Sequence, residues 1–304
     1  MDILEKDIID RFPPLEVYKK NLKKLTEINF ESLTFKEKTK AYFDAAILLP
    51  RITGDTSHTI FNKKANKYFY RARLQKHDNL NIEDTTLIQN FSFPPSSSCK
   101  KNGRANIKST SVFYCSNSAP AALNEIEIEI GSEGFFGVWE MQPNSNLEFN
   151  LLISNEIQKS NSWYDYIQDI SLQYQLYQKK DEGVLSSYLI ELRKFINDIF
   201  MHEKPPYSIS SFIANRYLYG NNNVEFIVYP SAKSFHNYVN YAFHPNVVIN
   251  SLKLSRVFMF KINDIISEGI NFTIKKVGYL DKSHIKWKSQ DESDVKYLTN
   301  GNKI

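Results

Sequence analysis

Two arginines, an acidic residue and a serine occur at points of the sequence where a chemical site could form. Arg71 lies in the second half of an alternating, aromatic-rich segment, and Arg104 follows Gly103 in a long polar connection. A guanidinium group binds phosphate through two parallel hydrogen bonds and does not lose its charge. Glu125 can stabilise positive charge on a ligand, and Ser231 offers a hydroxyl at an expected strand end. These residue types suit an anionic ligand.

Each of these residues also has an ordinary interpretation. Alone, Arg71 would be an exposed strand arginine, Glu125 a solvated helix residue and Ser231 a turn serine. Ser231 is not interpreted as a nucleophile, because no G-x-S-x-G turn accompanies it and no neighbouring base is evident. The order of the residues along the chain, rather than any one of them, favours a functional site.

The elements that must position these residues are strands and one short helix. The aromatic and β-branched content of residues 67–74 and 111–116 predicts two strands. Ser118 and Pro120 supply the start of a helix that leads towards Glu125. From Glu125 to Ile130 the residues alternate, so the pattern leaves open whether the helix ends early and passes into a strand.

Further elements are expected on both sides. Residues 14–50 favour two helices, the second starting at Thr34 with the capping-box spacing to Glu37. Residues 135–141 and 147–153 favour two strands joined by a turn at Pro143 and Asn144. Periodicity and composition predict three more helices and three more strands, over residues 163–177, 185–199, 208–219, 224–229, 258–262 and 272–277. The sequence therefore predicts an α+β fold with a mixed sheet and surrounding helices.

Composition narrows the class of protein. The 304 residues are 42% hydrophobic and 24% charged, as in folded globular proteins, and the net charge is only +4. A nucleic-acid partner is not expected from so small an excess of basic residues, and the six scattered histidines form no zinc pattern. No apolar run approaches the roughly 20 residues that cross a bilayer. Cys99 and Cys115 are expected to be reduced thiols, which indicates a cytoplasmic protein.

Taken in order, the motifs resemble those of the RES domain, a family named for its Arg, Glu and Ser. The resemblance spans residues 65–250, and each motif in it is short. Its segments are Tyr68–Arg73 (YFYRAR), Gly103–Asn106 (GRAN), Ser111–Ser116 (SVFYCS), Glu125 after Ala-Ala-Leu-Asn, Tyr229–Ser231 (YPS) and Asn240–Phe243 (NYAF).

This resemblance implies an ADP-ribosyltransferase-like fold and an enzyme that degrades NAD, with NAD as the substrate and no prosthetic group or metal. Arg71, Arg104, Tyr114, Glu125 and Ser231 match the family's site positions. Arg71, Glu125 and Ser231 are the expected catalytic residues, and Arg71, Arg104, Tyr114 and Ser231 the expected NAD-binding residues. Many members of the family act as toxins held by an antitoxin, so growth arrest and an antitoxin partner are also implied.

The chemistry of NAD agrees with these residue types. Two arginines suit its pyrophosphate. Cleavage of the bond between nicotinamide and ribose develops oxocarbenium character, which the Glu125 carboxylate can stabilise. Ser231 can bind either the nicotinamide carboxamide or a phosphate. Water or phosphate can be the acceptor, and for phosphate we expect Arg104 to bind it, with Lys101 and Lys108 nearby.

Two alternatives to NAD cleavage stay open. The same site could transfer ADP-ribose to a macromolecule. Alternatively, a changed loop at Ala105 could leave a non-catalytic nucleotide-binding or interaction module that uses its N-terminal helices for docking.

We expect an N-terminal helical extension over residues 1–60, a catalytic domain over 65–250 and C-terminal strands and a tail over 251–304 packed on that domain.

Overall fold

The computed structural model describes residues 12–46, 68–75, 87–142, 147–152, 157–178, 184–220, 224–234, 236–266 and 269–299. The turn expected at Pro143 and Asn144 lies outside these residues. So does the expected boundary between the N-terminal extension and the catalytic domain at residues 60–65.

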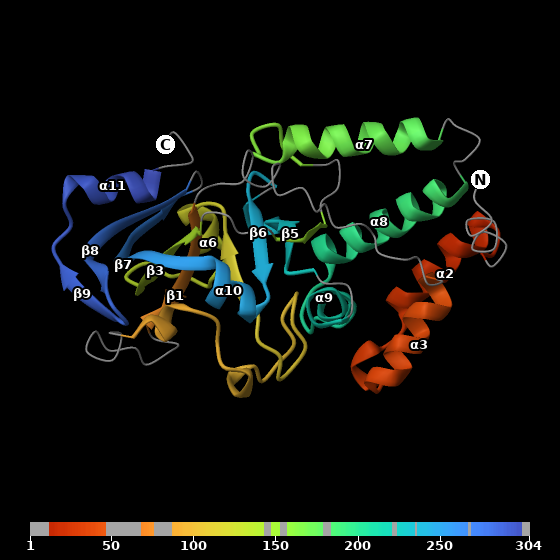
Figure 1. Ribbon diagram of the computed structural model, residues 1–304, viewed down its shortest axis with the longest axis horizontal. Helices are drawn as coiled ribbons and strands as arrows, with labels where there is room; N and C mark the ends of the chain where they lie inside the picture. The colour runs from red at the N-terminus through yellow and green to blue at the C-terminus, as the bar shows by residue number, and fades with distance from the viewer. Residues whose placement is uncertain are drawn as a thin grey trace.

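A nine-stranded, mostly antiparallel sheet forms the centre of the described chain (Figure 1). Its order is β4-β5-β6-β2-β1-β3-β7-β8-β9, and β4 and β5 form the parallel pair. The strands are β1 (Tyr68–Leu74), β2 (Phe113–Ser116), β3 (Glu133–Met141), β4 (Phe149–Leu151), β5 (Phe226–Pro230), β6 (Val239–Phe243), β7 (Leu252–Ile266), β8 (Gly269–Asp281) and β9 (His284–Lys288). The predicted α+β class is confirmed.

Eight α-helices lie around this sheet within the described residues. They are α2 (Leu15–Glu27), α3 (Phe35–Ala46), α6 (Ala119–Glu125), α7 (Tyr164–Gln178), α8 (Val184–His202), α9 (Ile209–Tyr219), α10 (Pro245–Ser251) and α11 (Glu292–Thr299). Among the described helices, none combines the length and apolar character needed to cross a membrane. Figure 1 shows α2 and α3 at one end of the molecule and α11 at the other.

Helix starts follow the local rules expected from the sequence. Thr34 and Glu37 form the predicted capping box: the Thr34 N–H donates to Glu37 Oε2 at 2.8 Å, and the Glu37 N–H donates to Thr34 Oγ1 at 3.3 Å. Ser118 caps α6 by accepting the Ala121 N–H at 3.2 Å. Because α6 carries Glu125 at its last position, this cap helps to place that carboxylate.

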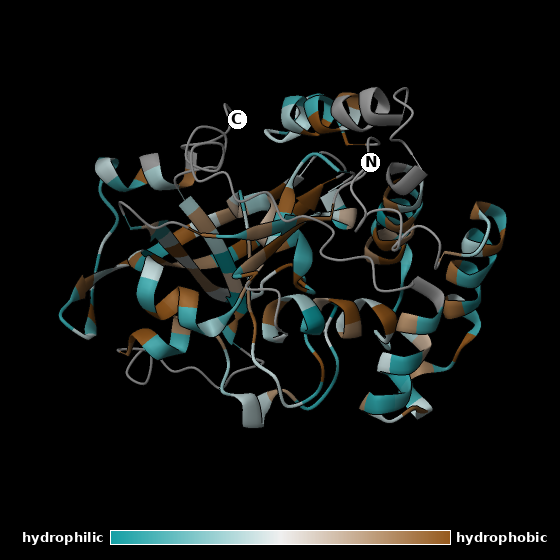
Figure 2. Cartoon of the chain, turned by 45° about the vertical axis from the view of Figure 1, so that its right-hand side comes forward, coloured by the Kyte–Doolittle hydropathy of each residue, from teal (hydrophilic) through white to brown (hydrophobic). Residues whose placement is uncertain are grey.

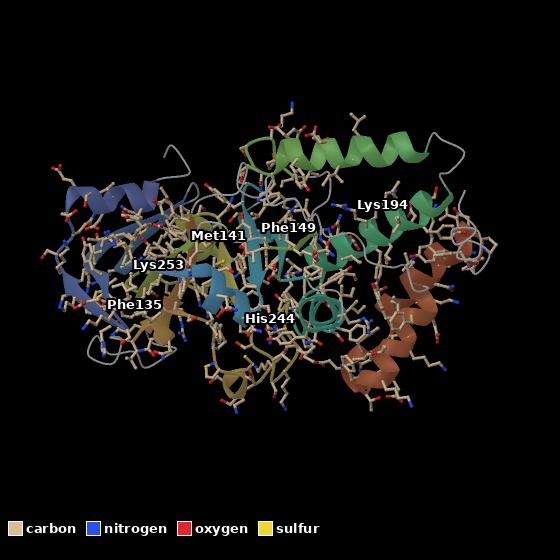
Figure 3. The ribbon with its side chains drawn as sticks, in the orientation of Figure 1. Phe135, Met141, Phe149, Lys194, His244 and Lys253 are labelled. Atoms are coloured by element: carbon tan, nitrogen blue, oxygen red, sulfur yellow. The ribbon has the colours of Figure 1, made fainter. Side chains whose placement is uncertain are left out.

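Hydrophobic side chains cover both faces of the sheet, as Figure 2 indicates by the brown strands at the centre. One face packs Phe69, Phe113, Phe149 and Tyr241 with Trp163, which precedes α7. The other face has two halves, one under α8 and α9 and the other under α6. Figure 3 shows Phe135 and Phe149 within the body of the sheet and Lys194 on α8.

The strands differ from the expectations in several respects. The two strands expected over residues 135–141 and 147–153 form as β3 and β4, but they do not pair: β1 and β7 occupy both edges of β3, and β4 pairs with β5. β7 and β8 are long strands, whereas short ones were expected. Only the middle of β7 is continuously buried, so only that part has the apolar composition from which a strand is predicted. The sequence left open whether the helix passes into a strand after Glu125. In the structure the helix ends there, and residues 126–129 form neither helix nor strand. β6, β9, α10 and α11 were not predicted.

Candidate functional site

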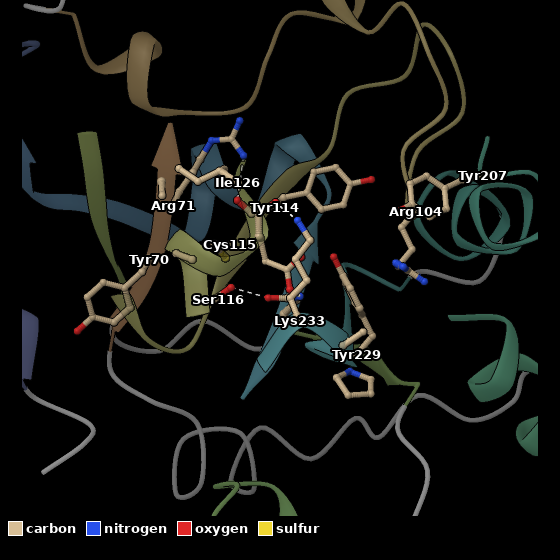
Figure 4. Close-up of a pocket in the computed structure, with 16 residues that line it drawn as sticks. Tyr70, Arg71, Arg104, Tyr114, Cys115, Ser116, Ile126, Tyr207, Tyr229 and Lys233 are labelled. Atoms are coloured by element: carbon tan, nitrogen blue, oxygen red, sulfur yellow. Dashed lines mark hydrogen bonds between the residues drawn. The ribbon is translucent and has the colours of Figure 1, made fainter. Parts of the chain in front are cut away.

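A cavity of about 340 Å³ opens where β1 and β2 separate (Figure 4). These two described strands pair only at Tyr70 and Ser116. One residue further along β1, the Arg71 guanidinium donates from Nη1 to the Tyr114 carbonyl at 2.9 Å. The residues that line the cavity are Tyr70, Arg71, Ala72, Arg104, Tyr114, Cys115, Ser116, Ala122, Glu125, Ile126, Tyr207, Tyr229, Pro230, Ala232, Lys233 and Asn240.

One row of side chains across the sheet contributes four of these residues. Tyr70 pairs with Ser116, Ser116 with Asn240, and Asn240 with Tyr229, on strands β1, β2, β6 and β5. Paired residues in an antiparallel sheet project to the same face. The register of the sheet therefore brings together polar groups that lie far apart in the sequence.

Glu125 faces this row from the C-terminal end of α6. Its Oε1 accepts a hydrogen bond from Ser231 Oγ at 2.7 Å and another from Asn240 Nδ2 at 2.6 Å. Ser116 Oγ in turn donates to Asn240 Oδ1. A carboxylate at the negative end of a helix is electrostatically unfavourable, so these donors offset a cost of the position. Lys233 Nζ also donates to the Glu125 main-chain carbonyl, at 3.2 Å.

Positive charge dominates the lining. Arg71, Arg104 and Lys233 contribute three positive charges and Glu125 one negative charge, so the formal sum over these lining residues is +2. Arg104 stacks over the Tyr207 ring, with Cζ 4.8 Å from the ring centroid, and donates to a main-chain carbonyl of α8. The cavity is thus suited to a ligand with about two negative charges.

Tyr114 holds the loop that carries Arg104. Its hydroxyl accepts from the Ala105 N–H at 2.8 Å and donates to Asn106 Oδ1 at 2.8 Å. A Cβ atom added at Gly103 would lie 2.4 Å from Asn106 Oδ1 and 2.8 Å from the Tyr114 hydroxyl oxygen, so a larger residue would displace the side chains that close this turn. Ala105 is fully buried in it. With alanine at that position, Arg104 still reaches the cavity.

Tyr229 supplies a buried wall next to Glu125. Figure 4 shows its ring beside the cavity with the hydroxyl directed inward. Burial raises the pKa of Tyr229 well above its usual range, so its hydroxyl remains protonated and can donate a hydrogen bond. Burial likewise raises the pKa of the Cys115 thiol, which disfavours a reactive thiolate there.

Four of the five residues singled out from the sequence, Arg71, Arg104, Tyr114 and Glu125, line this one cavity. Ser231 does not: it is fully buried, and its hydroxyl lies behind the Glu125 carboxylate, 3.1 Å from the Ser234 hydroxyl. The direct ligand contact expected for Ser231 is therefore replaced by contact with Glu125.

Sequence reasoning also missed part of the lining. Lys101 and Lys108, expected to support Arg104, do not line the cavity, whereas Lys233 does. Ser116, Tyr229 and Asn240 belonged to the quoted motifs but had no role assigned to them. The strand register places Ser116, Asn240 and Tyr229 in one row, and a prediction of that register would have identified them.

Comparison with protein-family models, curated proteins and solved structures finds no match for this chain.

Proposed function

We propose that this cavity binds NAD and cleaves the bond between nicotinamide and ribose, as the resemblance to the RES family implies. The observation that carries the proposal is the convergence of Arg71, Arg104 and Glu125 on one cavity. These three residues lie far apart in the sequence, and only the fold brings them together. An ADP-ribosyltransferase-like fold for the sheet is part of the same proposal.

The lining supports a dinucleotide in three respects. The formal charge of +2 complements a pyrophosphate, which arginine can bind through two hydrogen bonds. Tyr114, Tyr207 and Tyr229 offer aromatic surface for a base or a nicotinamide ring. The volume of about 340 Å³ falls within the range of about 300–1,000 Å³ that is typical of small-molecule sites.

Glu125 is the residue to which we assign the chemistry. The bond between ribose C1′ and the ring nitrogen breaks, and its electron pair leaves with nicotinamide, which becomes neutral. Positive charge spreads over C1′ and the ring oxygen of ribose, and the carboxylate stabilises it. Water then attacks C1′ and loses a proton to give ADP-ribose, or phosphate attacks to give ADP-ribose 1″-phosphate.

Purified protein incubated with NAD, with and without phosphate, tests the proposal. We expect nicotinamide and one of the two ADP-ribose products by chromatography and mass spectrometry. Glu125→Gln is expected to lower kcat by about a hundredfold or more, on the scale of lost transition-state electrostatic stabilisation. Glu127→Gln is the matched control, because Glu127 is exposed and lies outside the cavity two residues later.

Other outcomes select other functions. Label from NAD on a protein or nucleic acid would indicate an ADP-ribosyltransferase, and tight NAD binding without any product would indicate a non-catalytic module. Depletion of NAD and slowed growth on expression, abolished by Glu125→Gln, would support a toxin, and rescue by a co-expressed partner would support an antitoxin. Full activity of Glu125→Gln would contradict the assigned role.

A further inference from the structure

Asn240 is a buried polar residue that contacts both the proposed catalytic carboxylate and the sheet behind it. It is 4% exposed and lies on β6, an inner strand of the sheet. Its Nδ2 donates to Glu125 Oε1 at 2.6 Å, while its Oδ1 accepts from Ser116 Oγ. Both ends of the amide are thus engaged.

The Glu125 carboxylate determines which end of this amide faces it, and Ser116 holds the other end. A carboxylate oxygen accepts hydrogen bonds and cannot donate them, so only the NH₂ group of Asn240 can bind it. The hydroxyl of Ser116 donates to Oδ1 and so anchors the amide in this orientation. Because Ser116 and Asn240 are paired residues of β2 and β6, the backbone register holds this contact in place.

The two donors to Glu125 converge on one oxygen. Ser231 Oγ and Asn240 Nδ2 both bind Oε1, and within the described part of the chain no residue donates to Oε2. Rotation of the carboxylate would break two charge-assisted hydrogen bonds, each stronger than a neutral one. Oε2 is therefore the oxygen left for a ligand in the cavity.

We propose that Asn240 is a positioning residue that, with its amide anchored by Ser116, commits Glu125 to present Oε2 to the ribose of the substrate. This role rests on the proposed function, since it concerns how Glu125 meets NAD. Asn240 acts through Glu125 and takes no part in bond making or breaking. The expected signature is a loss in kcat without a matching loss in substrate affinity.

Asn240→Leu provides the sharpest test, because it keeps the approximate size of the side chain and removes the NH₂ donor without adding a charge. Loss of a hydrogen bond to a charged group corresponds to a fall in kcat of roughly tenfold to a hundredfold. Ser116→Ala removes the hydrogen bond that anchors Oδ1 of the amide, and we expect a fall of roughly twofold to tenfold. The Kd of ADP-ribose, measured by calorimetry, should change by less than about threefold in Ser116→Ala, because the Ser116 hydroxyl is engaged with Asn240.

Asn237→Ala serves as the control. Asn237 is exposed, accepts from Ser160 Oγ at 2.6 Å and does not line the cavity, so wild-type kcat is expected. If Asn240→Leu does not fold, as judged by thermal unfolding, Ser116→Ala decides the question. Wild-type kcat in either folded variant, or a loss confined to KM, would overturn the positioning role while leaving the proposed function intact. Absence of NAD cleavage by the wild-type protein would instead overturn the proposed function.

Discussion

The polar residues of the cavity differ in what they touch. Glu125, Arg104 and Lys233 are charged groups of the lining, whereas Ser231 and Asn240 are neutral and donate hydrogen bonds to Glu125. A buried hydroxyl or amide that orients a charged group fixes its geometry, and the charged group alone meets the ligand. We call the neutral residues that hold a charged side chain the orienting group. Substitutions in the orienting group and substitutions of the charged residues should therefore change kcat and ligand affinity differently.

Tyr114 belongs to the orienting group, and its removal should weaken binding. In Tyr114→Phe the ring remains, but the two hydrogen bonds to the turn that carries Arg104 are lost. We expect destabilisation of about 1–3 kcal/mol, since a buried amide and an acceptor lose their partner. The Kd of ADP-ribose should rise by about tenfold because Arg104 is less well held. Calorimetry measures the affinity and denaturant unfolding the stability.

Tyr219→Phe is a suitable control for this substitution. The Tyr219 hydroxyl donates to the Ser111 carbonyl, and the residue does not line the cavity. It should lose stability without loss of ADP-ribose affinity. Equal losses of affinity in both variants would mean that Tyr114 acts only through general stability.

At the scale of elements, the short helix α6 and the separation of β1 from β2 create the site. α6 has seven residues, and Glu125 is the last of them. A helix this short has little stability of its own in water, so its position depends on its cap and its packing. Ala119, Ala122 and Leu123 pack on the half of the sheet that includes β1 and β3.

Loss of the α6 cap should therefore affect turnover as well as stability. Ser118→Ala removes the acceptor for the Ala121 N–H and should cost about 1 kcal/mol of unfolding free energy. We expect kcat to fall, since misplacement of a catalytic group by about 1 Å can cost on the order of a hundredfold. Thr34→Ala breaks the capping box of α3 at a similar cost and should leave kcat unchanged. A Ser118→Ala variant with the kcat of the wild-type protein would show that α6 holds its place without the cap.

These elements also show what the sequence could predict and what it could not. Local signals were sufficient for α6, the α3 capping box and β1, because each depends on neighbouring residues. Strand pairing was not accessible in the same way: β4 joins β5 at one edge of the sheet, far from β3. The row Tyr70–Ser116–Asn240–Tyr229 depends on that pairing, so Asn240 and Tyr229 had no role before the register was known.

At the scale of the whole molecule, elements at both ends of the chain support the central sheet. Near the N-terminus, Tyr18 packs edge-on against Tyr188 of α8, with ring centroids 5.1 Å apart. Near the C-terminus, the Tyr70 hydroxyl of β1 donates to the Tyr297 carbonyl of α11 at 2.5 Å. Because Tyr70 belongs to the row under the cavity, α11 is connected directly to the strand that also carries Arg71.

Global stability should fall in mild acid because of His244, which caps α10 and is labelled in Figure 3. Its Nδ1 accepts the Asn246 N–H at 3.2 Å, and this requires the unprotonated nitrogen. Burial lowers the pKa of His244 below the ordinary value of 6.5. The unfolded chain therefore binds a proton more readily than the folded chain, and the free energy of unfolding decreases as pH falls below about 6.5. The decrease from this residue ends once the pH is below the folded-state pKa.

His244→Asn separates this contribution from the other titrating groups. Asparagine keeps an acceptor at the helix cap but does not titrate, so the slope of unfolding free energy between about pH 6.5 and 5 should become shallower. Denaturant unfolding at a series of pH values measures the slope, with His202→Asn on the exposed end of α8 as the control that retains the contribution of His244. The same slope in the His244→Asn variant and in the wild-type protein would assign the acid sensitivity to carboxylates. Binding of ADP-ribose, which stabilises only the folded state, should raise the unfolding free energy at every pH in both proteins.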